Sequence, residues 1–391
     1  TPSNSSAASD VYKRQPLISY DLQLQLLDSI ESRKIKNNAV DLFFNHPKLN
    51  DLSKTVSLKN KLSVDGQFEL DEYQCRAVEH ILSLNSGELL LIIGPPGTGK
   101  TRVIQKASYL LMERGEKVLI TSHTNRAVDN AIEKLPIEKT LRIGRPEKTL
   151  PHLHPYMLSY KARTILGEKL REIEEEIKKL RKERSELLKH LSWLRERKEK
   201  LPFKNFGIAT RNRLREIRRR IGELCVSRNQ WLKEESEKLI VETPIIGSTL
   251  VKSQLYPLSD INFDIVLIDE SSQASITLAL LGMIKAKKWV LIGDPYQLLP
   301  IFKSIKDKDD GLQEELSAFV HLLSKYQNRK LWLRLHYRSN TEIIGFSSRY
   351  VYNDEIKPAP LCSKHELHYN CLLYTSPSPR DLSTSRMPSS A

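Results

Sequence analysis

Short apolar runs alternate with helical patterns along most of the chain. The apolar runs lie at Leu89–Ile93, Lys117–Thr121, Pro244–Ser248, Phe263–Ile268, Lys288–Ile292 and Lys330–Leu333. Between them, apolar residues recur every three or four positions, as in Glu72–Leu84 and Arg102–Arg114, which predicts amphipathic helices. Short buried strands that alternate with helices are typical of a parallel sheet covered on both faces. The pattern therefore predicts an α/β fold.

The stretch from about 158 to 240 interrupts this alternation with two long heptad patterns. The first pattern places Arg184 at one seam position and apolar residues at Leu170, Ile173, Ile177, Leu180, Leu187, Leu191 and Leu194. The second places apolar residues at Leu214, Ile217, Ile221, Leu224 and Trp231. A break at Leu201–Gly207 separates the two patterns. We therefore expect an antiparallel helical hairpin inserted into the α/β domain.

Basic residues are concentrated on the faces of this predicted hairpin. They are Lys178, Lys179, Arg181, Lys182, Arg211, Arg213, Arg215, Arg218, Arg219 and Arg220. A solvated coiled-coil surface would account for them, and Glu174–Glu176 favour that interpretation for the first helix. The second helix is much more one-sided in charge, which favours contact with nucleic acid. Both interpretations stay open.

The two ends of the chain differ in composition from the rest. Residues 1–15 and about 370–391 are rich in Ser, Pro and Ala. Asp10–Gln15 can be encoded by GATGTGTATAAGAGACAG, and the reverse complement of that DNA, read one base in, encodes Cys371–Ser376. The two peptides are thus opposite-strand translations of one element, which resembles a transposase sequencing adapter. We expect both end segments to be non-native.

Charge and cysteine content narrow the class of partner and compartment. The chain of 391 residues has a formal net charge of +14, which favours a polyanionic partner, nucleic acid before a membrane surface. No apolar segment approaches the roughly 18 residues that a membrane-spanning helix needs. The cysteines (Cys75, Cys225, Cys362 and Cys371) form no C-x-x-C pair, so neither a zinc site nor a disulfide framework is predicted. A reducing intracellular compartment fits best, either the cytoplasm or, in a eukaryote, the nucleus.

A glycine-rich motif follows the first apolar run. Gly94, Pro95, Pro96, Gly97, Thr98, Gly99, Lys100 and Thr101 match the Walker A pattern G-x-x-x-x-G-K-[ST]. Backbone N–H groups of such a loop, together with the positive end of the following helix, surround phosphate oxygens. Lys100 is expected to neutralise the β- and γ-phosphates, and the Thr101 hydroxyl to bind Mg²⁺. The motif predicts a P-loop NTPase.

Candidate catalytic groups follow two later apolar runs. Asp269 and Glu270 come directly after Phe263–Ile268, where Asp269 is expected to bind Mg²⁺ and Glu270 to polarise the attacking water. Gln297 lies in Gly293–Pro300 after the next run. An amide there can bond both the γ-phosphate and the water, although an ordinary Asp-Pro turn would also explain this segment.

The order of these motifs resembles that of superfamily 1 helicases. The motifs are Glu72–Gln74, the Walker A motif, Ser122–Asn130, Asp269–Ala274, Gly293–Pro300 and His336–Arg338. Arg142–Pro146 and the helical insertion before Gly247–Thr249 resemble superfamily 1B, the group of the nonsense-mediated-decay helicase and the immunoglobulin mu-binding helicase. The resemblance covers about residues 69–355. It implies a RecA-like domain, ATP and Mg²⁺ as cofactors, and single-stranded RNA or DNA as partner.

The resemblance also implies roles for individual residues. Gln74 would read the adenine edge, Tyr337 would stack near the adenine, and Arg338 would reach the γ-phosphate. Contacts with the nucleic-acid backbone would come from Thr124, Asn125, Ser248 and Thr249. The chain departs from the family pattern beside Arg338, because His336 replaces the usual Gln and Ser339-Asn340 the usual Met-His.

The expected organisation has five segments. They are a non-native segment at 1–15, a stalk-helix remnant (helix at 17–45) and linker at 16–68, a first RecA-like domain at 69–335, the start of a truncated second RecA-like domain at 336–369, and a non-native segment at 370–391. ATP in this family is hydrolysed between two such domains. We therefore expect the fragment to bind nucleotide weakly and to turn it over slowly.

Two functions from different classes fit these motifs. The first is an ATP-dependent helicase or translocase that moves 5′ to 3′ on a single strand, the direction being implied by the subgroup alone. The second is a nucleotide-switched clamp that binds nucleic acid without unwinding it. A P-loop ATPase without a nucleic-acid partner is disfavoured by the net charge and by Ser122–Asn130. The motifs do not distinguish RNA from DNA, because recognition of the 2′-OH needs further contacts.

Overall fold

The computed structural model describes residues 4–35, 37–52, 69–196, 204–301 and 310–364. The chain divides into two compact units, which we describe separately. Unit 1 combines Thr1–Pro151 with Pro244–Ala391, and unit 2 is His152–Thr243. The predicted non-native segment at 370–391 lies outside the described residues.

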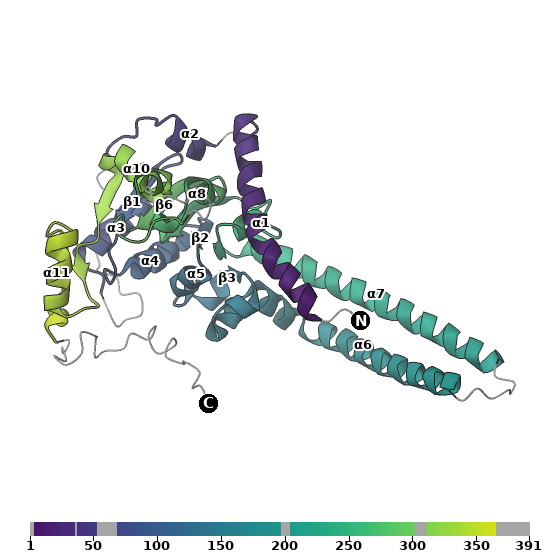
Figure 1. The fold of residues 1–391 in the computed structure, drawn as a ribbon. Helices are drawn as coiled ribbons and strands as arrows, with labels where there is room; N and C mark the ends of the chain where they lie inside the picture. Colours follow the sequence, from purple (N-terminus) through teal and green to yellow (C-terminus); the bar gives the residue numbers. More distant parts are fainter. Residues whose placement is uncertain (1–3, 36, 53–68, 197–203, 302–309, 365–391) are drawn as a thin grey trace, which may run out of the picture. The chain divides into compact units, whose positions relative to one another are not determined.

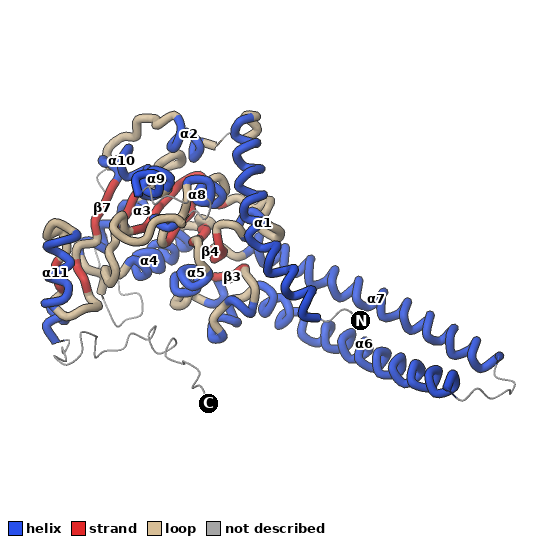
Figure 2. The backbone as a smooth tube through the Cα atoms, viewed as in Figure 1, coloured by secondary structure: helices blue, strands red, loops and turns tan. Residues whose placement is uncertain are grey.

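A seven-stranded parallel sheet forms the core of unit 1 (Figure 2). Its strands are β1 (Leu89–Ile93), β2 (Val118–Ser122), β3 (Thr140–Ile143), β4 (Ile245–Thr249), β5 (Phe263–Asp269), β6 (Ala286–Gly293) and β7 (Lys330–Trp332). Their order is β3-β4-β2-β5-β6-β1-β7, and neighbouring strands are parallel. Every residue of β1 and of β2 is buried, which explains why these strands are unbroken apolar runs in the sequence.

Helices cover both faces of this sheet (Figure 1). One layer consists of α3 (Glu72–Leu82), α4 (Lys100–Glu113) and α5 (Asn125–Ile132), in which α4 contacts both neighbours. The other contains α8 (Ile276–Met283) and α10 (Ala318–Lys325), with α9 (Asp310–Leu316) beside α10. The predicted α/β fold, a parallel sheet with helices on both faces, is confirmed.

Two helices precede this core. They are α1 (Asn4–Glu31) and α2 (Asn38–Phe44), and both contact α8. The single helix expected at 17–45 is interrupted because Arg33 adopts a left-handed φ of 52° and Asn37 caps a new helix by accepting the N–H of Ala39 at 2.8 Å. Helix α1 begins at Asn4, inside the segment 1–15, whose non-native origin stays a prediction.

A small element group follows β7 in unit 1. It consists of β8 (Leu335–His336), α11 (Thr341–Val351) and β9 (Lys357–Pro358), and the two short strands pair in parallel. Ile344, Tyr352 and Ile356 form its apolar cluster, against which Trp332 of β7 packs. The assignment of 336–369 to a second RecA-like domain stays a prediction.

Unit 2 is built on two helices of 39 residues each, α6 (Leu158–Glu196) and α7 (Lys204–Glu242), which run side by side (Figure 1). Ile173 and Ile177 of α6 form an apolar cluster with Leu224 of α7, at the predicted seam positions. Of the predicted break at Leu201–Gly207, residues 201–203 lie outside the described residues, whereas 204–207 already belong to α7, so the second helix begins earlier than predicted. Within the described ranges, no helix combines the length and apolar character needed to cross a membrane.

Candidate nucleotide-binding site

The carboxyl ends of four neighbouring strands meet at one edge of the sheet. Ile93 of β1 pairs with Gly293 of β6, and Ile268 of β5 pairs with Leu291 of β6. Ser122 of β2 pairs with Asp269 of β5. The loops that follow these strands therefore share one edge, which is where open α/β sheets bind their ligands. They surround a cleft of about 690 Å³.

The Walker A segment forms a tight loop between β1 and α4. Gly97 and Gly99 have φ angles of 79° and 83°, a left-handed conformation that favours glycine. The Thr98 hydroxyl donates to Pro95 O at 2.7 Å, which closes the loop on itself. Helix α4 begins at Lys100, and no side chain caps its N-terminus at Gly99. Lys100 and Thr101, the first residues of this 14-residue helix, line the cleft, so the helix N-terminus lies where helices commonly bind anions.

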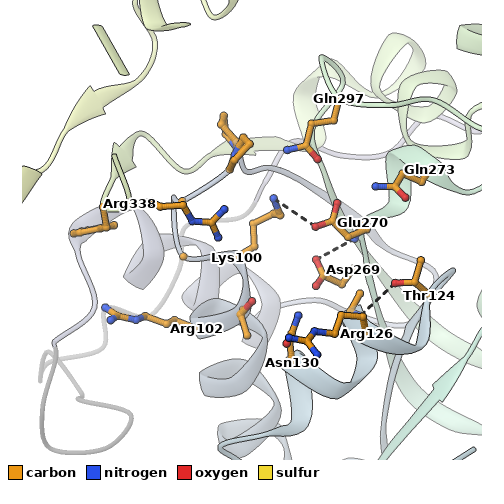
Figure 3. Close-up of a pocket in the computed structure, with 17 residues that line it drawn as sticks. Lys100, Arg102, Thr124, Arg126, Asn130, Asp269, Glu270, Gln273, Gln297 and Arg338 are labelled. Carbon is orange, nitrogen blue, oxygen red and sulfur yellow. Dashed lines mark hydrogen bonds and ion pairs between the residues drawn. The ribbon is translucent and has the colours of Figure 1, made fainter. Parts of the chain in front are cut away.

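Lys100 lies at the centre of the cleft and is nearly buried. Its Nζ donates to Gly94 O at 2.7 Å and lies 4.0 Å from Glu270 Oε1. Figure 3 shows Lys100, Glu270, Gln297 and Arg338 arranged around one space. The ammonium group is thus held between the phosphate loop and the predicted catalytic carboxylate.

Glu270 combines backbone strain with an unsatisfied oxygen. Its φ of 52° is left-handed, which typically costs about 1–3 kcal/mol in a non-glycine residue and is common at functional sites. Its Oε2 is buried and has no hydrogen-bond partner within the described part of the chain. Its backbone N–H donates to Asp269 Oδ1 at 3.0 Å. Glu270 itself lines the cleft, which is large enough for a water molecule and a phosphate group.

The residues that would hold Mg²⁺ fit that ion. Thr101 and Asp269 both line the cleft and offer a hydroxyl and a carboxylate, the hard oxygen ligands that Mg²⁺ prefers. In the described ranges, no three His, Cys, Asp or Glu side chains form a metal site by themselves.

The loop after β6 connects the cleft to the element group after β7. Gln297 lines the cleft, and its backbone N–H donates to Asp294 O at 3.2 Å. The buried Asp294 carboxylate accepts the N–H of Tyr296 at 3.0 Å and the hydroxyl of Tyr352 at 2.8 Å. Burial raises the pKa of Asp294, while these two hydrogen bonds act in the opposite direction. Tyr352 follows α11, so the loop of Gln297 is tied to that helix.

His336 bridges the phosphate loop and its own segment. Its Nδ1 lies 2.8 Å from Pro96 O, and its Nε2 accepts the N–H of Ser339 at 2.7 Å. Because a carbonyl can only accept, the proton is on Nδ1 and the ring is neutral. A Cβ on Gly97 would lie 2.6 Å from the His336 ring, so glycine is needed there for contact as well as for φ. A glutamine side chain also offers a donor group and an acceptor group, since its amide has an NH₂ and a carbonyl oxygen.

Tyr337 continues this connection. Its backbone N–H donates to Gly97 O at 2.9 Å, and its hydroxyl donates to Asp71 Oδ2 at 2.6 Å. Burial and this hydrogen bond to Asp71 raise the pKa of Tyr337 well above its usual range. Asp71 also caps α3 through the N–H of Gln74 at 2.8 Å. Both Tyr337 and the exposed Arg338 line the cleft.

Gln74 supports the phosphate loop directly. Its Nε2 donates to Thr98 O at 3.0 Å, its Oε1 accepts the N–H of Asp71 at 3.2 Å, and the residue is only 1% exposed. A Cβ on Gly99 would collide with the Gln74 amide. In this conformation both ends of the amide bond to the protein, and the predicted role of Gln74 in reading adenine stays a prediction.

The four predicted nucleic-acid contacts lie near the same edge of the sheet but in different surroundings. Thr124 caps α5, accepts the N–H of Ala127 at 3.2 Å and lines the cleft. The Asn125 amide oxygen accepts from Arg142 at 3.0 Å. Ser248 is buried and Thr249 half-buried at the end of β4. The structure therefore places only Thr124 in the cleft itself.

Four polar residues of the cleft had no predicted role. They are Arg102, Arg126, Asn130 and Gln273. Arg126, Asn130 and Gln273 belong to the quoted motifs Ser122–Asn130 and Asp269–Ala274, so their presence beside a Walker A motif was the available signal. Arg102 follows the motif by one position, in the first turn of α4, which directs it to the same side.

Known proteins that resemble this chain include ATP-dependent helicases. The model of a family described as AAA domain matches residues 69–305. The "Uncharacterized ATP-dependent helicase MJ0104" of Methanocaldococcus jannaschii is 29% identical over 74% of this chain and 45% of its own length. The "DNA replication ATP-dependent helicase/nuclease DNA2" of Saccharomyces cerevisiae is 25% identical over 82% of this chain and 16% of its own. The "DNA-binding protein SMUBP-2" of Mesocricetus auratus is 27% identical over 76% of this chain and 28% of its own length.

The chain spans less than half the length of each of these relatives. The family match itself covers more than half of the chain and includes the Walker A loop, Asp269, Glu270 and Gln297. The protein therefore belongs to the AAA-domain family, and the relatives that it resembles include proteins named as ATP-dependent helicases.

Proposed function

We propose that this chain is the ATP-binding motor part of a helicase or translocase that moves 5′ to 3′ along single-stranded RNA or DNA. The observation that supports this most strongly is the arrangement of Lys100, Glu270, Gln297 and Arg338 around one cleft. Three of them follow adjacent strands of unit 1, and Arg338 comes from the segment after β8. Two separate segments thus meet where the γ-phosphate would lie.

Each side chain has a distinct task in this proposal. Lys100 would exchange Gly94 O for phosphate oxygens, and the orphaned Oε2 of Glu270 would orient the attacking water and accept its proton. Gln297 and Arg338 would contact the γ-phosphate from opposite segments. Mg²⁺, when bound by Thr101 and Asp269, would neutralise charge that develops on the phosphates.

Recognition of the base and of the strand would use the remaining predicted residues. Tyr337 would pack beside the adenine, since Asp71 holds its hydroxyl, and Gln74 would read the adenine edge after exchanging its protein partners. Thr124, Asn125, Ser248 and Thr249 would contact the nucleic-acid backbone, which gives sequence-independent and salt-sensitive binding.

Binding of a fluorescent ATP analogue in Mg²⁺ tests the site. Lys100→Ala should abolish binding, whereas Lys139→Ala, which removes an exposed lysine outside the cleft, should leave it unchanged. Glu270→Gln should retain binding, because it keeps the side-chain volume, and should lose hydrolysis in a version of the protein that hydrolyses ATP. Equal binding by the Lys100→Ala variant and the unchanged chain would exclude this cleft as the ATP site.

A strand-displacement assay on the full-length protein separates the motor from a nucleotide-switched clamp. A motor releases the displaced strand only with hydrolysable ATP, and Lys100→Ala stops it. A clamp binds the strand in a nucleotide-dependent way and displaces nothing. Substrates with a 5′ or a 3′ overhang, made of RNA or DNA, test direction and strand type in the same assay.

A further inference from the structure

The two sides of the α6–α7 hairpin differ in how their charges are paired. On one side, Arg213 of α7 pairs with Glu183 of α6 at 2.7 Å, and Arg220 of α7 pairs with Glu176 of α6 at 2.9 Å. The two pairs share one antiparallel register, because Arg220 follows Arg213 by seven residues on α7 and Glu176 precedes Glu183 by seven residues on α6. These ion pairs identify one face of the hairpin, which we call the paired face.

The opposite side is found from the helical period. At 3.6 residues per turn, Arg211, Arg215 and Arg218 share one stripe of α7, about half a turn away from Arg213 and Arg220. The buried side chains Ile217 and Leu224 lie between the two stripes and face α6. All three arginines of the first stripe are exposed.

Helix α6 contributes to the same opposite side. Lys178 and Arg181 are exposed and lie about half a turn from Glu176 and Glu183. The register of the two ion pairs places Lys178 beside Arg218 and Arg181 beside Arg215. We call the side formed by Lys178, Arg181, Arg211, Arg215 and Arg218 the basic face.

The basic face has a high density of unpaired charge. Its members fall within about 11 Å along the hairpin axis, since seven residues of helix rise about 1.5 Å each. Within the described residues, none of the five forms an ion pair, and Arg215 makes only a 3.4 Å hydrogen bond to the Asn212 amide. On the same side of α6, Glu174 lies four residues before Lys178 and is paired with Arg163 at 3.3 Å.

This distribution argues against a merely solvated surface. A solvated coiled-coil surface usually intersperses both signs of charge, as the paired face does. Five like charges in this space repel one another unless a polyanion neutralises them. Duplex DNA presents one phosphate charge per about 1.7 Å of axis, so about 11 Å of it carries a similar number of charges of opposite sign.

We propose that the basic face binds the phosphodiester backbone of nucleic acid, as a contact separate from the four residues of unit 1 that are predicted to contact that backbone. This proposal rests on the proposed function, since it assumes that the protein binds nucleic acid at all. It resolves the two interpretations of the hairpin by assigning the solvated role to the paired face and nucleic-acid contact to the basic face.

Two matched triple variants of the chain test the proposal. Arg211→Gln/Arg215→Gln/Arg218→Gln changes the basic face, and Arg213→Gln/Arg219→Gln/Arg220→Gln removes the same charge from the remaining surface of the same helix. Fluorescence anisotropy with single-stranded and duplex oligonucleotides is measured across a range of salt concentrations. Circular dichroism and binding of the ATP analogue verify that each variant is folded.

The basic-face variant should bind the oligonucleotide at least roughly tenfold more weakly at low salt. The slope of log K against log salt should be about 2 units shallower for this variant, because each lost phosphate contact with a single strand removes about 0.7 from the slope. The other variant should retain the slope of the unchanged chain. Equal slopes for both variants would overturn the proposal. If the unchanged chain binds no oligonucleotide, the proposed function fails instead.

Two further arms complete the test. If the basic-face triple variant does not fold, the single variants Arg211→Gln and Arg218→Gln should each reduce the slope by about 0.7, and an unchanged slope in both rejects the proposal. Poly-glutamate at equal charge concentration should compete poorly with the oligonucleotide. Competition as strong as that of an unlabelled oligonucleotide would assign the basic face to an acidic protein and reject nucleic acid.

Discussion

A buried ion pair joins α5 (Asn125–Ile132) to β3, and its contribution to stability can be tested by substitution. Arg142 Nε donates to Asp129 Oδ1 at 2.7 Å, and both side chains are at most 2% exposed. The remaining nitrogens of the guanidinium group donate to Ile143 O at 2.9 Å and Asn125 Oδ1 at 3.0 Å. The second carboxylate oxygen of Asp129 accepts the N–H of Leu150 at 3.2 Å.

Removing one member of the Arg142–Asp129 ion pair should lower the free energy of unfolding more than removing both members. Asp129→Leu leaves a buried guanidinium group without its counter-charge, and Arg142→Met leaves a buried carboxylate, each at a cost of about 3–5 kcal/mol. With about 2–4 °C of Tm per kcal/mol for a domain of this size, each single variant should melt roughly 10 °C lower. The double variant has no uncompensated charge, so its Tm should be no lower than that of either single variant.

Thermal unfolding followed by circular dichroism measures these three variants beside a surface control. Lys287→Met breaks an exposed ion pair with Asp264 (3.3 Å) and should change Tm little, because surface pairs contribute little to stability. If the losses of the two single variants simply add in the double variant, the ion pair does not act as a unit and the reasoning is refuted.

Nucleic-acid binding then separates stability from side-chain orientation. Arg142 holds the Asn125 amide oxygen, which leaves the amide nitrogen as the group free to turn toward a phosphate. The double variant should therefore bind a single-stranded oligonucleotide more weakly than the unchanged chain even where its Tm has recovered. Asn125→Asp should keep the bond to Arg142 and still weaken binding, because it replaces the donor with a negative oxygen. Unchanged affinity in Asn125→Asp would show that Asn125 does not contact the strand.

Three further predictions use contacts of the cleft. Gly97→Ala should lower Tm and ATP-analogue affinity far more than Gly115→Ala, since both glycines have positive φ but only Gly97 lies against the His336 ring, and equal losses would contradict a role for that contact. His336→Ala should lower Tm by several degrees, because it leaves the buried N–H of Ser339 unpaired, at about 1–3 kcal/mol, and removes the bond to the exposed Pro96. His336→Gln should retain most of the stability, and similar losses in both variants would refute the bridging role. Tyr352→Phe removes a hydrogen-bond donor from the buried Asp294. Burial raises the pKa of Asp294 above its value in the unfolded chain, so the stability of the folded state decreases as the pH rises from the unfolded pKa through the folded pKa. The Tm difference between Tyr352→Phe and the unchanged chain should therefore be larger at pH 8 than at pH 4.5, and the opposite trend would contradict an ionised Asp294 bonded to Tyr352.

Much of the sheet was predictable because its strands are buried on both faces. Leu89–Ile93 was located at its observed bounds, and the other predicted runs differ by one or two residues at an end. Strand β3 was missed because it is short and contains Arg142, whose charge disguises a buried position in the sequence. Its burial depends on Asp129 of α5, a partner 13 residues away that no local pattern reveals.

The residues that line the cleft were predictable where a sequence motif directly follows a strand and so has a fixed place in the fold. The Walker A loop, Asp269, Glu270, Gln297 and Arg338 all line it, because each follows a strand or segment whose end is fixed by the sheet. Gln74 shows the limit of such reasoning. A motif gives the residue and its neighbourhood, whereas the partners that hold its amide, Thr98 and Asp71, depend on how α3 lies against the loop.

The element group after β7 is bound to the phosphate loop itself, and this has a thermodynamic consequence. His336 and Tyr337 bond to Pro96 and Gly97, and Tyr352 bonds to Asp294 beside Gln297. Any movement of the group must either break these hydrogen bonds or carry the loop with it. A nucleotide that reshapes the loop therefore changes the stability of these contacts, and by linkage the position of the group changes nucleotide affinity by the same factor. The elements that bind phosphate and those that would respond to it are thus one connected structure within unit 1.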